Sequence, residues 1–127
     1  MEREHFEGLV RRALDTLPDE IAQRVDNVDV EVQDWPTGTQ LAAAGVPPGR
    51  TLLGLYQGIP LTKRTSGYNL VAPDRITIYQ GPLERIARND DDLVERVRDV
   101  VVHEVAHHFG ISDARLSELE AERRNAR

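Results

Sequence analysis

Apolar and polar residues alternate with two different periods along the chain, helical at both ends and strand-like in the middle. Residues 2–18 place apolar side chains at helical spacing and end at a proline, which predicts an amphipathic helix. Residues 27–36 alternate valines with acidic residues, as a strand with one buried face does. Further strands are predicted at residues 51–58 and 74–80.

Two connections flank the middle strand. Residues 37–50 contain several glycines and prolines, with one short helical turn expected at residues 41–44. Residues 59–73 carry two prolines, a glycine and mixed polar side chains, a length that is typical of a functional or mobile loop. In the strand that follows, alternation places the two isoleucines on one face and Thr77 and Tyr79 on the other.

The chain turns helical after this strand. Residues 81–89 offer one or two turns. A long helix is predicted at residues 91–109, with Asp90 to Asp92 as its cap and acidic first turn. Gly110 stands where a left-handed C-cap belongs.

A last helix is predicted at residues 114–126, capped by Ser112 or Asp113. The order helix, strands, helices contains no βαβ alternation, which indicates an α+β fold. We expect a small mixed or antiparallel sheet packed on the N-terminal helix and on the helix of residues 91–109. One hydrophobic core is expected for this length, so residues 1–127 are predicted to form a single domain.

Composition and charge narrow the classes of function. A formal net charge of -6 argues against nucleic acid and anionic membranes as partners. The chain has no cysteine, so any metal must be held by His, Asp or Glu. No stretch is apolar enough to cross a bilayer or to form a signal peptide. We therefore expect a cytoplasmic protein. We also expect a monomer, although this does not follow from composition or charge.

Three of the four histidines fall in "VVHEVAHHFG", residues 101–110. At about 100° per residue, His107 lies roughly 40° from His103 and one turn further on, so both imidazoles can converge on one ion. The face expected to pack on the sheet consists of Leu93, Val94, Val97, Val101 and Val105. Glu104 falls at the edge of this face, where a carboxylate needs a partner because unpaired burial is costly.

The order H-E-x-x-H is the arrangement that zinc-dependent hydrolysis requires. Imidazoles at positions i and i+4 bind Zn²⁺, and the intervening Glu104 accepts a proton from the attacking water. Such a motif arises by chance in roughly one chain in a hundred of this length. The alternative is a solvated His and Glu face, and a His and Asp site also suits other divalent ions.

Two histidines and a water molecule occupy three of the four coordination positions of a zinc ion, so one more protein ligand is expected. Gly110 can reverse the chain so that Asp113 swings back towards the ion. The competing interpretation makes Asp113 the N-cap of the last helix, a task that Ser112 can also perform. Other candidate ligands are Glu118, Glu120 and Glu122, which otherwise form a solvated helix face.

Two histidines are predicted to lie outside the metal site. His108 projects into the aliphatic face, so we expect a buried, hydrogen-bonded structural histidine. His5, on the first helix, is expected at the surface.

The spacing resembles the extended zincin signature H-E-x-x-H-x-x-G-x-x-H/D, which is matched here by His103, Glu104, His107, Gly110 and Asp113. With "LLGLYQGIPLT" and "RITIYQGPLER", the motif resembles the minimal zincin-like family of small bacterial zinc metallopeptidases over about residues 5–120. The resemblance implies that the metal helix packs beneath a sheet. It also implies a peptide lying along the sheet edge, with residues 76–79 as the strand beside the cleft.

The spacing of the extended signature resembles that of the metzincins, one branch of the zincins, but some metzincin features are absent from the sequence. The only methionine is Met1, so no Met-containing turn can lie beneath the zinc. No Tyr or His follows Asp113, so only an earlier residue could stabilise an oxyanion. The candidates are Tyr56, Tyr68, Tyr79 and Arg64.

Together these patterns predict a zinc-dependent metallopeptidase, a hydrolase acting on a peptide or protein substrate. His103, His107 and Asp113 would hold Zn²⁺, and Glu104 would be the general base. One alternative is a non-catalytic zinc-binding interaction module of the same fold, with residues 59–73 as its docking surface. Another is a small hydrolase that acts on non-peptide amides.

Overall fold

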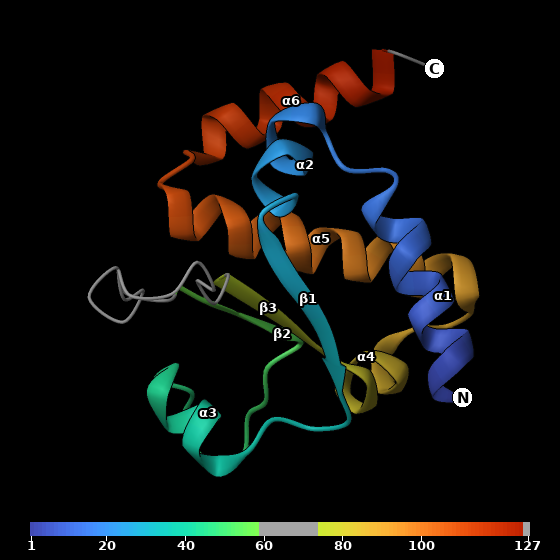
Figure 1. Cartoon of the computed structure of the whole chain (residues 1–127), viewed down its shortest axis with the longest axis vertical. Coiled ribbons are helices and arrows are strands. Elements are labelled where there is room, and N and C mark those ends of the chain that lie inside the picture. Colours follow the sequence, from blue (N-terminus) through green and yellow to red (C-terminus); the bar gives the residue numbers. More distant parts are fainter. Residues whose placement is uncertain (59–73, 126–127) are drawn as a thin grey trace, which may run out of the picture.

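The computed structural model describes residues 1–58 and 74–125, which contain one three-stranded mixed sheet (Figure 1). Its strands are β1 (Val28–Gln33), β2 (Gly54–Gln57) and β3 (Asp74–Tyr79), in the order β1-β3-β2. β1 runs parallel to β3, and β2 runs antiparallel to it. The three predicted strands and the α+β class with a small mixed sheet are confirmed. The predicted loop of residues 59–73 lies outside the described residues.

The central strand is β3, because both of its edges are paired; Tyr56 of β2, for example, lies opposite Ile76. Thr77 and Tyr79 are as fully buried as the isoleucines on the opposite face, so both faces of β3 are covered. A strand paired on both edges cannot receive another strand. The expectation that a peptide lies along residues 76–79 is therefore wrong, and the edge strands of the described sheet are β1 and β2.

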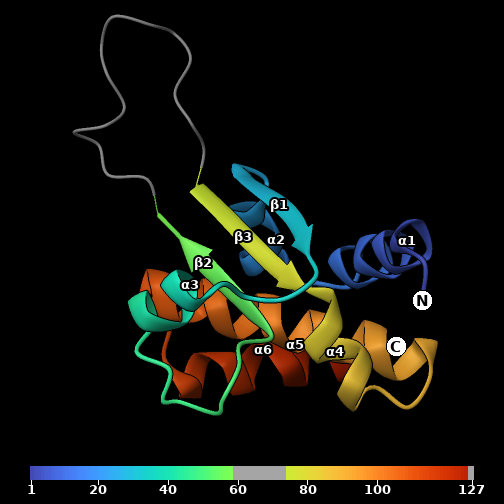
Figure 2. The same ribbon diagram turned by 90° about the horizontal axis from the view of Figure 1, so that it is seen from below.

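The longest helix, α5 (Asp90–Phe109), lies between the sheet and α6 (Asp113–Asn125), as Figures 1 and 2 show. The helix α1 (Arg3–Leu14) packs along α5. The buried side of α5 includes the predicted aliphatic face, namely Leu93, Val94, Val97, Val101 and Val105. The core of the domain thus joins the sheet, the N-terminal helix and the H-E-x-x-H helix, as predicted. No helix of the described residues is long and apolar enough to cross a membrane.

The sequence pattern does not predict α2 (Asp19–Val25), which packs against α5 and β1. We expect Pro18 to end the first helix, but α1 already ends at Leu14 and Pro18 is the N-cap residue of α2, with φ -56°. A fixed φ of this value is compatible with entry into a helix. The single buried residue of α2 is Ile21, which is too little for a periodic apolar signal.

Two further short helices follow strands, one between β1 and β2 and the other between β3 and α5. The predicted turn at residues 41–44 belongs to α3 (Gly38–Ala43). Its N-cap Thr37 forms a capping box with Gln40, which explains the earlier start. The helix α4 (Gln80–Ile86) follows β3 directly, where one or two helical turns are predicted.

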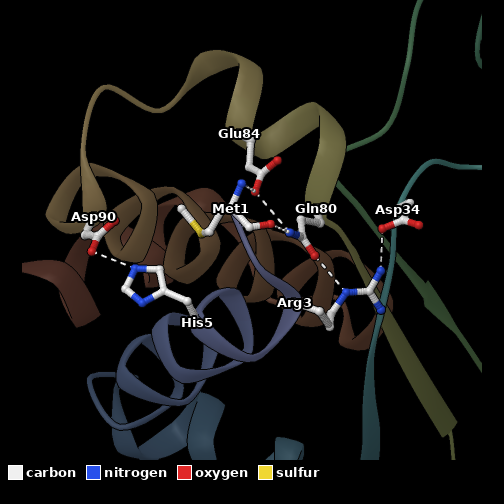
Figure 3. A network of polar contacts seen from close by, with 7 residues as sticks. All are labelled: Met1, Arg3, His5, Asp34, Gln80, Glu84 and Asp90. Atoms are coloured by element: carbon white, nitrogen blue, oxygen red, sulfur yellow. Dashed lines mark hydrogen bonds and ion pairs between the residues drawn. The ribbon is translucent and has the colours of Figure 1, made fainter.

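Polar contacts fasten the N-terminal segment to the sheet and to α4 (Figure 3). The Arg3 guanidinium donates hydrogen bonds to Gln80 Oε1 at 2.7 Å and to the Val32 carbonyl at 3.1 Å, and forms an ion pair with Asp34. Gln80 Nε2 donates to the Met1 carbonyl at 3.0 Å. The start of α1 is thereby fixed beside the end of β1.

Both ends of α5 are capped by neighbouring residues. The N-cap is Asn89, whose side chain accepts a hydrogen bond from the Asp92 N–H at 2.8 Å, so the cap lies one residue before the acidic run that we expect to supply it. At the other end Gly110 adopts φ 68° and ψ 28°, which confirms the predicted left-handed C-cap. The chain can therefore leave α5 sharply and enter α6 within a few residues.

Candidate metal centre

His103 and His107 lie one turn apart on α5, and both are exposed to solvent. The ring of His103 is oriented by its own helix, because its Nδ1 lies 2.7 Å from the carbonyl oxygen of Asp99. A carbonyl only accepts, so Nδ1 carries a proton, and in the neutral ring the lone pair is on Nε2. A histidine oriented in this way is the form that ligates metal ions.

Glu104 points from α5 towards the sheet and is partly buried. One carboxylate oxygen, Oε1, accepts a hydrogen bond from the backbone N–H of Tyr56 on β2 at 3.1 Å. The carboxylate at the edge of the aliphatic face thus has the partner that its burial requires. Nothing in the sequence pattern indicates that this partner is a backbone amide of residue 56.

Burial raises the pKa of the Glu104 carboxyl above its ordinary value. The hydrogen bond from Tyr56 opposes this rise, and so do the neighbouring His107 and His103. Desolvation is the largest of these influences, since burial disfavours the charged form of the carboxyl. A carboxylate with a raised pKa is a stronger base, which suits proton transfer near neutral pH.

Asp113 is the first residue of α6 and is exposed. The hydroxyl of Ser112 accepts a hydrogen bond from the Arg115 N–H at 3.1 Å, which is the contact of an N-cap. Of the two capping residues considered from the sequence, Ser112 therefore makes the cap. The carboxylate of Asp113 is not required for that task.

A cavity of about 410 Å³ lies between α5 and α6 and brings His103 and Asp113 to the same space. Its lining residues are Val102, His103, Asp113, Leu116, Ser117 and Glu120. His107 shares a helix stripe with His103 but does not line this cavity. Within residues 1–58 and 74–125, no three His, Asp or Glu side chains are gathered closely enough to share one metal ion.

The other candidate ligands on α6 form ion pairs. Glu120 lies 2.9 Å from the guanidinium of Arg98, whose side chain is only 1% exposed. Glu118 and Glu122 lie 2.8 Å and 3.7 Å from Arg115. Arg115 also reaches Glu20 of α2 at 3.0 Å, so these charges hold α6 against its neighbours.

The prediction of a buried His108 is wrong, since its side chain is 37% exposed. It lies in the last turn of α5, where its ring stacks on Tyr56 with 4.1 Å between centroids. Its Nε2 lies 3.9 Å from Asp74 Oδ2. His5 is at the surface as predicted, and its ring contacts Asp90 at 2.8 Å, as Figure 3 shows.

Of the four residues considered as stabilisers of the oxyanion, the structure describes Tyr56 and Tyr79. The Tyr56 hydroxyl donates to Asp74 Oδ2 at 2.8 Å, so its proton is already engaged. The Tyr79 hydroxyl is buried and has no hydrogen-bond partner among the described residues, and burial raises the pKa of this phenol. Tyr68 and Arg64 lie outside the described residues.

Comparison with known proteins places the chain in a family. Residues 25–123 match the model of the zincin-like metallopeptidases, so the chain belongs to the zincin-like metallopeptidase family. Its fold is similar to that of a conserved hypothetical protein from Thermo thermophilus, with a TM-score of 0.53 and 20% sequence identity. That similarity covers 86% of this chain and 94% of the other, and it concerns the fold alone. No curated protein compared with the chain matches it.

Proposed function

We propose that this chain is a zinc-dependent metallopeptidase that hydrolyses peptide bonds, with Glu104 as its general base. Membership of the zincin-like metallopeptidase family supports this function. The observation that carries it is the placement of Glu104, which is held 3.1 Å from the Tyr56 N–H between two histidines one helical turn apart. A solvated polar face would not hold its carboxylate against the sheet.

His103, His107 and Asp113 are the residues that would hold the zinc ion. The donor types fit, because imidazole nitrogens and a carboxylate oxygen are ordinary zinc ligands. The three side chains are not gathered around one point within the described residues, so zinc binding would have to draw them together. His103 and Asp113 already line one cavity. When bound, zinc supplies a Lewis acid that polarises the scissile carbonyl and makes water acidic enough to ionise near neutral pH.

Glu104 performs the proton transfers. Its carboxylate accepts a proton from the attacking water and later gives it to the leaving amine. Burial raises the pKa of this carboxyl, which makes the carboxylate a stronger base for the first step. The Tyr56 N–H holds the carboxylate in place while it does so.

The substrate of this proposal is a peptide or protein segment lying along β2. This strand is an edge of the described sheet, and it is the strand that contacts Glu104. An edge strand can bind an extended peptide through its outward backbone groups, here those other than the Tyr56 N–H, which Glu104 already engages. We further propose that the chain is a monomeric single domain that acts in the cytoplasm.

The test is a zinc titration combined with a peptidase assay of the full chain. We expect one zinc ion per chain in the wild type, and much weaker binding in His103→Ala. His5→Ala is the matched control, because this exposed histidine lies outside the motif and should bind zinc normally. Hydrolysis of a peptide library should require zinc and stop with a chelator. A zinc-loaded chain without turnover would instead support the non-catalytic module.

A further inference from the structure

We propose that His108 and Asp74 are positioning residues, which fix the Tyr56 side chain and so keep the Tyr56 backbone N–H directed at Glu104. This inference rests on the proposed function, in which Glu104 is the general base. It gives a role to the third histidine of the motif region, which the metal site does not use.

The first contact holds the face of the Tyr56 ring. The imidazole of His108 stacks on it at 4.1 Å with an angle of 26° between the planes. Phe109 meets both rings edge-on, at 5.9 Å from Tyr56 and 4.8 Å from His108. Stacked and edge-on pairs are the favourable arrangements of aromatic rings, so the last turn of α5 restricts the rotation of the tyrosine.

The second contact holds the far end of the same ring. The Tyr56 hydroxyl donates to Asp74 Oδ2 at 2.8 Å, and His108 Nε2 lies 3.9 Å from that oxygen. Side chains from β2, β3 and α5 therefore meet at one point. Gly58 follows β2 at this point, and a Cβ there would lie 2.9 Å from His108 Cε1. A small residue at position 58 is thus needed for the stacking.

These contacts matter to Glu104 because they restrain the residue that donates to it. β2 has only four residues and is paired on one side only, with β3, within the described sheet. Backbone pairing with β3 therefore fixes only one edge of β2, and the Tyr56 N–H is on the other edge, directed at Glu104. Restraining the Tyr56 side chain restrains its backbone, and with it the hydrogen bond to the carboxylate.

The experiment measures amide hydrogen exchange by NMR on the zinc-free full chain, and kcat and KM on the zinc-loaded chain with a fluorogenic peptide. The variants are His108→Ala, His108→Phe and Tyr56→Phe, with His5→Ala as the matched control. We expect His108→Ala to speed exchange of the Tyr56 amide by about tenfold while the amides of β3 stay protected. We expect kcat to fall by a similar factor, with KM and zinc content unchanged.

The other variants separate positioning from a general loss of stability. His108→Phe keeps a stacking ring and should restore most of both readouts, whereas Tyr56→Phe loses the hydroxyl contact and should resemble His108→Ala. Unchanged Tyr56 exchange in His108→Ala would overturn the inference, and so would a His108→Phe variant as impaired as His108→Ala. If the wild type shows no turnover, the proposed function fails, and the exchange measurement alone decides this inference.

Discussion

The Glu104 carboxylate and the Tyr56 backbone N–H are joined by a 3.1 Å hydrogen bond that spans 48 positions of sequence. It connects the H-E-x-x-H helix to an edge strand, so the position of the proposed base depends on how β2 packs on α5. The close approach of β2 to α5 can be changed by substitution, which tests this dependence.

At Gly54, the backbone of β2 lies close to the Val100 side chain of α5. A Cβ at this residue would overlap the Val100 side chain and lie 3.2 Å from the Thr77 carbonyl oxygen. We expect Gly54→Ala to lower the free energy of unfolding by about 1–3 kcal/mol, the usual cost of overpacking. Urea denaturation of the zinc-free chain measures this.

The companion change for Gly54→Ala is Val100→Ala, which removes the atoms that the new methyl group would meet. The double variant should be more stable than the sum of the two single effects predicts. Strict additivity would show that the close approach at Gly54 is not what excludes a side chain.

Gly110 adopts φ 68°, a left-handed conformation, and a Cβ there would meet no atom within 4 Å. Gly110→Ala should therefore destabilise the chain by about 1 kcal/mol through backbone strain alone. Gly38→Ala is the matched control, because its Cβ also has open space and its φ is not positive. Equal stability of the two alanine variants in thermal denaturation would refute the role of Gly110 as the C-cap.

Ser112 and Asp113 should have separable roles. Ser112→Ala removes the N-cap of α6 and should cost about 1 kcal/mol of stability in the zinc-free chain. Asp113→Ala should leave that stability nearly unchanged and weaken zinc binding by more than about 100-fold, as expected for a lost ligand. Calorimetric zinc titration of both variants distinguishes them, and wild-type affinity in Asp113→Ala would exclude it as a ligand.

The carboxylate of Asp92, at the start of α5, should make the stability of the folded state depend on pH. Hydrogen bonds from the Arg88 N–H at 2.9 Å and from Arg96 Nε at 3.0 Å hold the pKa of Asp92 below its ordinary value of 3.8. The folded state thus binds this proton less readily than the unfolded state. The resulting stability is present above the unfolded pKa and is lost as pH falls through the lower folded pKa.

Asp92→Asn should accordingly be less stable than the wild type at neutral pH, and the difference should shrink below pH about 3.8. Denaturation of the zinc-free chain at a series of pH values measures it. Asp91→Asn is the control, since that side chain is 89% exposed and pairs with Arg12 at 3.1 Å on the surface. A constant difference between Asp92→Asn and wild type at all pH values would contradict the assignment.

Local periodicity predicts the regular elements well. The alternating valines predict β1, and the aliphatic spacing of α5 predicts the residues that face the core. It fails at α2, which buries only Ile21, because one apolar residue sets no period. It also fails for β3, because alternation within a strand does not reveal whether a neighbour pairs with each edge.

The motif on α5 is likewise visible in the sequence, but its surroundings are not. His103, Glu104 and His107 follow from helical spacing alone. The partners Tyr56 and Asp74 come from two strands, and no local pattern connects them to the helix. His108 projects into the aliphatic face on a helical wheel, but it is exposed because it lies in the last turn of α5.

The central claim is that Glu104 is the base of a zinc-dependent peptidase. Its most direct test is kcat/KM for peptide hydrolysis by zinc-loaded Glu104→Gln, beside the wild type and the exposed control Glu7→Gln. We expect Glu104→Gln to bind zinc normally and to lose activity by roughly 10²–10⁴-fold, the usual contribution of a general base, while Glu7→Gln stays active. Wild-type turnover in Glu104→Gln would contradict the claim.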